Sequence, residues 1–195
     1  MSTGTGRRAF LVLHGYTNRR PEGHWQRRLV TALRADGELA VYPALPDTDD
    51  PHLEPWVEAV QTELALLDHA GEVVVVAHSL GAVTWLHVAG RGLPRPVGRV
   101  LLVAPPSPAR TAEALPRFVL PALDGDAVRA AAHDTLLVGS DADPWCPEGI
   151  GAAYAEPLGV RHVVVEGGKH FALDDGFGPW AAPLDWCRDP GSVWT

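Results

Sequence analysis

Short runs of apolar, mostly β-branched residues alternate along the chain with longer segments in which apolar residues recur at helical spacing. The runs are continuous rather than alternating, which is typical of parallel strands that are buried on both faces. The pattern predicts six strands, at residues 9–13, 39–42, 73–77, 100–103, 135–138 and 162–165.

Amphipathic helices are predicted between these strands. Apolar residues recur at helical spacing within 25–33, 53–67 and 83–88, and Trp56 and Trp85 fall on the core sides of two of these helices. Strands that alternate with helices through short connections form right-handed, parallel crossovers. We therefore expect a three-layer α/β/α sandwich around a mainly parallel sheet of about six strands. The proline-rich residues 105–121 are the least regular segment and are expected to form a wall of a cleft.

Composition narrows the class of protein. The 195 residues are 46% hydrophobic and 21% charged, which predicts a single folded domain over residues 1–195. A net charge of −8 disfavours a nucleic-acid partner. No apolar run resembles a signal peptide or reaches the roughly 18 residues of a membrane span. Two cysteines, Cys146 and Cys187, are too few for a disulfide scaffold. A cytoplasmic protein is expected.

The most informative segment is residues 73–82, where a valine run ends at a single serine. Small residues lie two positions to either side of Ser79, Ala77 before it and Gly81 after it. This is the spacing of a nucleophile elbow, with alanine in the first glycine position. The helix that begins at Leu80 would direct its first amides toward a negative charge formed at the serine.

A serine hydroxyl needs a base, and an imidazole that is oriented by a carboxylate suits that role. His170 follows the sixth strand, and the order serine, acid, histidine is that of α/β-hydrolases. Two acids follow the fifth strand. Asp143 is favoured because Pro144 would fix the turn that carries it, and Asp141 is the alternative. His78 is not expected to act as the base, because adjacent side chains leave an elbow in different directions.

An oxyanion hole requires two backbone N–H groups. Leu80, directly after the nucleophile, would supply one. Tyr16, past the Gly15 that permits a tight bend after the first strand, is the better candidate for the other. His14 is expected to bond the backbone of this loop.

Four elements together resemble a known family: His14-Gly15, His78–Gly81, Asp143-Pro144 and Gly168–Phe171. They are similar to the small lidless α/β-hydrolases related to retinoblastoma-binding serine hydrolase, and residues 175–180 are similar to the bacterial branch. The resemblance implies a reduced α/β-hydrolase fold without a lid domain, carboxylic-ester hydrolysis, and an acid directly before the proline. Lys169 departs from the family pattern, which commonly has glycine there.

We therefore predict a cofactor-independent serine hydrolase that acts on short-chain or soluble esters through an acyl-enzyme on Ser79, with His170 and Asp143. Trp145 and Trp180 flank the catalytic loops and are candidates for the substrate pocket, with simple packing as the alternative. No metal is expected, because the acidic residues 47–54 are typical of a solvated loop before a helix. The alternatives are an idle hydrolase fold that binds a partner protein through the same cleft, or a peptidase or thioesterase.

Overall fold

The computed structural model describes residues 7–194. Six strands form one sheet in the order β2-β1-β3-β4-β5-β6, and every neighbouring pair is parallel. The strands are β1 (Arg8–Leu13), β2 (Leu39–Val41), β3 (Glu72–His78), β4 (Val97–Val103), β5 (Ala132–Ser140) and β6 (Arg161–Val165). All six predicted strands are present. β4 and β5 each begin three residues before the predicted start, because Val97 pairs with Ala132 and Arg99 with Asp134 where no continuous apolar run marks a strand.

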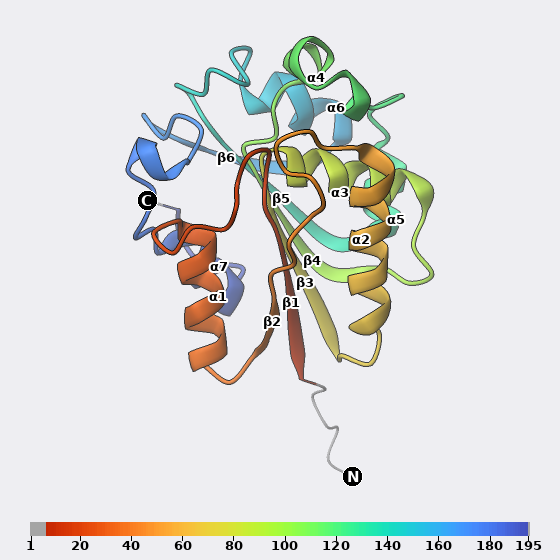
Figure 1. The fold of residues 1–195 in the computed structure, drawn as a ribbon, viewed down its shortest axis with the longest axis vertical. Helices are drawn as coiled ribbons and strands as arrows, with labels where there is room; N and C mark the ends of the chain where they lie inside the picture. Colours follow the sequence, from red (N-terminus) through yellow and green to blue (C-terminus); the bar gives the residue numbers. More distant parts are fainter. Residues whose placement is uncertain (1–6, 195) are drawn as a thin grey trace.

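Helices cover both faces of the sheet (Figure 1). α1 (Trp25–Ala35) and α7 (Ala182–Arg188) lie on one face, and α2 (Leu53–Leu66), α3 (Leu80–Arg91) and α5 (Gly125–Ala131) lie on the other. Each face has its own cluster of buried apolar side chains. The predicted three-layer sandwich is confirmed, and the described residues form no separate lid domain.

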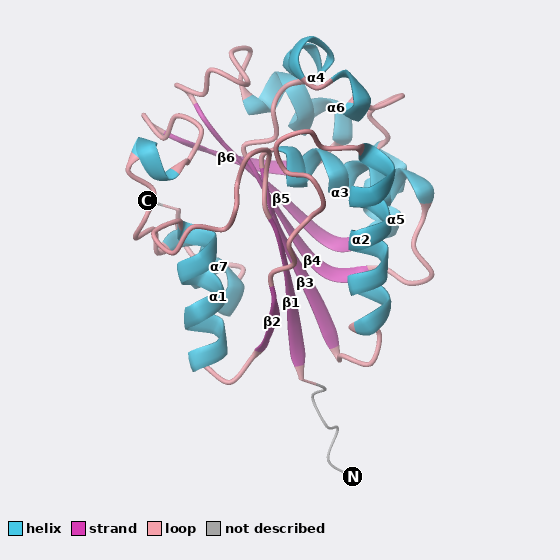
Figure 2. Ribbon diagram, viewed as in Figure 1, coloured by secondary structure: helices cyan, strands magenta, loops and turns pink. Residues whose placement is uncertain are grey.

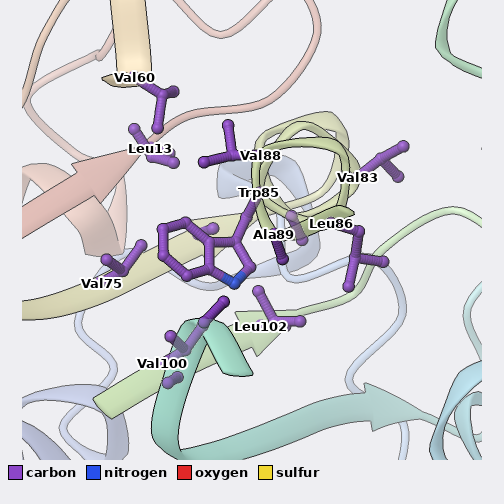
Figure 3. Close-up of a cluster of buried hydrophobic side chains, with 14 of the residues drawn as sticks. Leu13, Val60, Val75, Val83, Trp85, Leu86, Val88, Ala89, Val100 and Leu102 are labelled. Atoms are coloured by element: carbon purple, nitrogen blue, oxygen red, sulfur yellow. The ribbon is translucent and has the colours of Figure 1, made fainter. Parts of the chain in front are cut away.

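The face that carries α3 has a close-packed core. Trp85 of α3 is fully buried, and its indole lies against Val75 of β3 and Val100 and Leu102 of β4 (Figure 3). Trp56 of α2 is also fully buried, so both tryptophans pack in the core as predicted. Truncating a tryptophan in such a site to alanine typically costs about 3–5 kcal/mol of stability. This packing holds α3, and with it the end of the helix that follows Ser79, in a fixed position against the sheet.

The remaining elements are short, and most gather near the carboxyl ends of the strands (Figure 2). They are α4 (Pro108–Ala114), η1 (Pro116–Phe118), η2 (Gly151–Ala155), α6 (Glu156–Leu158) and η3 (Leu173–Asp175). The proline-rich segment after β4 thus contains two short helices, and Ser107 begins the first by accepting a hydrogen bond from the Arg110 amide. No helix of residues 7–194 is both long and apolar enough to cross a bilayer.

Candidate active site

Ser79 occupies a strained turn between β3 and α3. Its backbone has φ 55° and ψ −127°, a region that residues with a side chain rarely enter and that costs about 1–3 kcal/mol. The Ser79 amide donates to the Val103 carbonyl of β4 at 2.9 Å, which ties the turn to the neighbouring strand. The turn holds the Ser79 hydroxyl at the carboxyl edge of the sheet.

Small neighbours make the turn possible. A Cβ on Gly81 would lie 2.5 Å from the His14 carbonyl oxygen, which is backbone and cannot move aside easily. A Cβ on Gly15 would lie 2.7 Å from the Cβ of Ser79. Ala77 is fully buried within β3. The elbow therefore packs directly against the chain that leaves β1, and glycine at both contact points is a steric requirement.

The structure brings together the three residues that the sequence nominated. The Ser79 Oγ lies 2.8 Å from Nε2 of His170, and Nδ1 of His170 lies 3.0 Å from both Asp143 carboxylate oxygens. The Asp143 side chain is 1% exposed and the His170 side chain 15%. One ring nitrogen of the histidine thus faces a buried carboxylate, and the other faces the serine hydroxyl.

The two candidate acids have different surroundings. Asp143 is buried, and its Oδ1 accepts from the Trp145 amide at 2.9 Å, within the turn that contains Pro144. Asp141 is exposed, and its Oδ1 accepts from the Gly167 amide at 2.7 Å. The favoured Asp143 therefore contacts the imidazole, whereas Asp141 joins two loops.

Two backbone amides near Ser79 are available to an anion. Leu80 is the first residue of α3, so its N–H has no partner within the helix. Tyr16 lines the same cavity as Ser79, and its N–H donates to no acceptor in residues 7–194, although the amides of the next two residues, Thr17 and Asn18, do. Their service as an oxyanion hole stays a prediction.

His14 supports the loop that carries Tyr16. Its Nε2 accepts from the Leu45 amide at 2.9 Å, so its Nδ1 carries the proton and donates to the Gly15 carbonyl at 2.9 Å. Burial lowers the pKa of His14 below the ordinary histidine value, which favours the neutral ring that this pair of bonds requires. The predicted structural role of His14 is confirmed.

A cavity of about 460 Å³ opens over the Ser79 hydroxyl. Its walls come from the loop after β1, the proline-rich segment, Trp145 and the residues around His170, and they include Pro106 and Leu115. The proline-rich segment thus forms part of the cleft wall, as predicted. The Trp145 ring lies 6.0 Å from the His170 ring between centroids.

Trp180 does not line this cavity, which corrects the prediction that placed it in the substrate pocket. Its ring stacks on Phe171 with 4.8 Å between centroids, and it packs edge to face on Trp25, Phe177 and Trp194. Phe171, the residue after the histidine, is fully buried on that side of the loop. Trp180 therefore packs beneath the loop of His170 rather than beside a substrate.

Two further residues contribute to the site in ways that the sequence did not predict. His24 caps α1, with Nδ1 accepting from the Gln26 amide, and it also lines the cavity. Burial lowers its pKa to about 4. Asp175 accepts hydrogen bonds from the amides of His170 and Ala172, both at 3.2 Å on the same oxygen. The position of His24 before an apolar helical pattern could have signalled a cap. Asp175 begins the segment 175–180 that resembles the bacterial branch, but nothing in the sequence signals its bonds to the His170 loop.

Residues outside the three nominated groups offer no second nucleophile or metal centre in the described chain. Cys146 is buried, and burial raises the pKa of its thiol to about 12. In the acidic loop, Asp49 pairs with Arg19 and Asp50 pairs with Arg117. Residues 7–194 contain no cluster of three or more side chains spaced to hold a metal.

Comparisons with known proteins identify relatives that share the fold. The chain is 27% identical over 170 residues to the Bacillus subtilis (strain 168) protein YdeN, covering 85% of this chain and 87% of YdeN. The solved structure of YdeN superposes with a TM-score of 0.79 at 25% identity, covering 93% and 97% of the two chains. A YdeN-like protein from Pectobacterium atrosepticum follows with 0.72 at 24% identity, covering 92% and 88%.

A more distant structure has the same fold. Est1E from Butyrivibrio proteoclasticus superposes with a TM-score of 0.65 at 14% identity, covering 95% of this chain and 88% of Est1E. The family described as serine hydrolase matches residues 10–186, a range that contains the elbow, the acid and the histidine. This small α/β-hydrolase therefore belongs to the serine hydrolase family.

Proposed function

We propose that the protein hydrolyses carboxylic esters through an acyl-enzyme on Ser79. The observation that supports this most directly is the unbroken line of hydrogen bonds from Ser79 through His170 to Asp143, at 2.8 and 3.0 Å. His170 takes the hydroxyl proton through Nε2 as Oγ attacks the ester carbonyl carbon. Asp143 holds the ring in the tautomer that leaves Nε2 free, and stabilises the imidazolium that forms.

The reaction then proceeds in two halves. The tetrahedral oxyanion is held by the Tyr16 and Leu80 amides, and loss of one such donor typically lowers turnover about 10²–10³-fold. The intermediate collapses by breaking its bond to the alcohol oxygen, which receives the proton from His170 Nε2. A water molecule next gives its proton to His170 and attacks the acyl-enzyme, and the carboxylic acid leaves as Ser79 regains its proton.

The cavity supports a small ester as the substrate. Its volume of about 460 Å³ lies within the range of small-molecule sites, and no lid domain in the described residues covers it. Pro106, Leu115 and Trp145 offer apolar contacts to an acyl or alcohol group. We expect short-chain or soluble esters to react faster than emulsified long-chain lipids. The cytoplasmic location expected from the sequence remains a prediction.

The test measures hydrolysis of p-nitrophenyl esters from acetate to decanoate, alongside an acyl thioester and a peptide p-nitroanilide. Wild-type protein should favour the short oxygen esters, and Ser79→Ala should lower kcat by at least about 10³. Ser192→Ala, outside the cavity, is the matched control and should keep full activity. A fluorophosphonate should label Ser79 alone, as read by peptide mass spectrometry.

Two results would contradict the proposal. Full esterase activity in purified Ser79→Ala would exclude Ser79 as the nucleophile. A folded wild-type protein that neither hydrolyses any substrate nor reacts with the fluorophosphonate would favour the alternative, an idle hydrolase fold that binds a partner. Faster hydrolysis of the thioester or the anilide would be consistent with an acyl-enzyme on Ser79, but it would assign a substrate class other than oxygen esters.

A further inference from the structure

His78, the residue directly before the nucleophile, has no part in the proton transfers proposed above. Its side chain is buried and lies between two other imidazoles, with ring centroids 5.5 Å from His24 and 5.3 Å from His170. The Trp25 ring packs on it edge to face at 5.7 Å. The His78 side chain therefore lies beside His170, while His170 remains the imidazole that contacts Ser79.

The ring of His78 is bonded to the backbone of His170. Its Nε2 lies 2.8 Å from the His170 carbonyl oxygen. Because a carbonyl only accepts, Nε2 carries the proton and donates. Nδ1 of the same ring is then an unprotonated acceptor, and it is buried without a partner among the described residues. A buried Nδ1 without a partner is unfavourable. The bond from Nε2 to the His170 carbonyl is therefore the one hydrogen bond that the His78 ring makes among the described residues.

The other side of His170 is held by a second side chain. One oxygen of Asp175 accepts from the amides of both His170 and Ala172, at 3.2 Å each. The peptide groups before and after the His170 Cα are therefore both bound by side chains, not by a strand or helix. Lys169 and Phe171, on either side, have positive φ values of 47° and 55°, which is unfavourable backbone for residues other than glycine.

We propose that His78 is a positioning residue for the base: its Nε2–H holds the His170 carbonyl, opposite Asp175, so that the His170 ring stays within hydrogen-bond reach of Ser79. The inference rests on the proposed function. It links the elbow and His170 through two adjacent residues: Ser79 donates to the His170 ring, and His78 donates to the His170 carbonyl. Loss of this bond would let the ring drift from Oγ, and a displacement of about 1 Å can lower the rate about 10²-fold.

His78 suits this role because it stays neutral. Burial, and to a smaller extent the charges of His170 and His24, lowers the pKa of His78 well below the ordinary histidine value. A neutral donor beside His170 adds no repulsion when His170 becomes an imidazolium. A lysine or a charged histidine in the same place would oppose that step.

The experiment compares His78→Gln with His78→Met. The two side chains are nearly the same size, and only glutamine has an N–H that can replace Nε2–H. We expect His78→Met to lower kcat for p-nitrophenyl acetate about 10–100-fold, with KM changed less than about threefold, and to slow fluorophosphonate labelling similarly. His78→Gln should recover kcat to within about threefold of wild type. Equal losses in both variants, or no loss in a folded His78→Met, would overturn the proposal.

If His78→Met does not fold, a second pair tests whether bonds to the His170 backbone hold its ring, through the opposite contact made by Asp175. Asp175→Asn keeps a carbonyl oxygen for the two amides and Asp175→Ala does not, so only the alanine variant should lower kcat. Equal kcat in the two variants would show that the ring does not depend on such bonds and would overturn the proposal. The outcome is also separable from failure of the proposed function, which an inert wild-type protein would signal. If the wild-type protein is inert, NMR of the His170 Nδ1 proton tests the proposal instead. This proton should be protected from exchange in wild type and His78→Gln, and its protection should be lost in His78→Met. Protection in all three would overturn the proposal.

Discussion

Ser79 and His170, the proposed nucleophile and base, are held in place by different kinds of interaction. The elbow around Ser79 is a local feature, in which one strand, one strained residue and one helix are consecutive in the chain. Its contacts with the chain that leaves β1 are steric, through Gly81 and Gly15, and one backbone hydrogen bond from the Ser79 amide ties it to β4. The loop of residues 166–175, called here the histidine loop, has no such local rule. It is held by side chains of Asp141, His78 and Asp175, and by the Trp25 indole, which donates to the Phe171 carbonyl at 3.1 Å.

This difference predicts which kinds of substitution would disrupt each half of the site. An elbow that depends on close packing fails when an atom is added, because the backbone carbonyls of β1 cannot yield. A loop that depends on hydrogen bonds fails when a donor or acceptor is removed, and a side chain of similar shape can rescue it. Three predictions test this contrast.

The largest effect on kcat is expected from changing the carboxylate that contacts His170. Asp143→Asn should lower kcat about 10⁴-fold with little change in stability, because the amide favours the wrong tautomer of His170. The matched control is Asp141→Asn, which keeps an oxygen for the Gly167 amide and should change kcat less than about threefold. Steady-state ester hydrolysis measures both. Equal effects in the two variants would mean that Asp143 is not the carboxylate that orients the base.

The second prediction adds one methyl group to the elbow. Gly81→Ala places a Cβ against the His14 carbonyl oxygen and should lower the free energy of unfolding by about 3 kcal/mol, with loss of ester hydrolysis. Gly90→Ala lies in the same helix with nothing within 4 Å of its new Cβ, and should gain up to about 1 kcal/mol. Urea unfolding measures both values. A tolerated Gly81→Ala would show that the elbow is not limited by packing.

The smallest effect is expected from lowering the pH. Protonation of the buried histidines near His170 should reduce the free energy of unfolding. The folded-state pKa of His24 is about 4, against an ordinary value of 6.5. The unfolded chain therefore binds more protons between these values, and the stability that His24 contributes is full above pH 6.5 and is lost as the pH falls toward 4. The loss should reach about 2 kcal/mol at about pH 5.

His24→Asn isolates this contribution, because asparagine is a good helix cap and does not titrate. The variant should lose less stability than wild type between about pH 7.5 and about pH 5, by about 2 kcal/mol in urea unfolding. Parallel pH curves for the two proteins would show that His24 is not kept neutral by burial.

The fold was predictable because each strand is marked by its own apolar residues, including the edge strand β6, which has no buried residue. The starts of β4 and β5 were not predictable, since Ala132 and Asp134 extend β5 by pairing with β4 and no apolar run marks them. In the site, Ser79 and Asp143 were predictable because an elbow and an Asp-Pro turn are local backbone requirements. Trp180 was misplaced because a ring near His170 in sequence can point to either side of the loop, and here it stacks on Phe171 on the side away from the cavity.

The sequence by itself determined the order of strands and helices and the chemistry available at the strand ends, because apolar periodicity and the size of residues beside Ser79 act over a few residues. Only the tertiary structure decided which side chains hold the histidine loop. The bonds from His78 and Asp175 to the His170 backbone depend on where that loop crosses the sheet edge. Such bonds leave no periodic trace in the chain, since any residue's carbonyl or amide can accept or donate them.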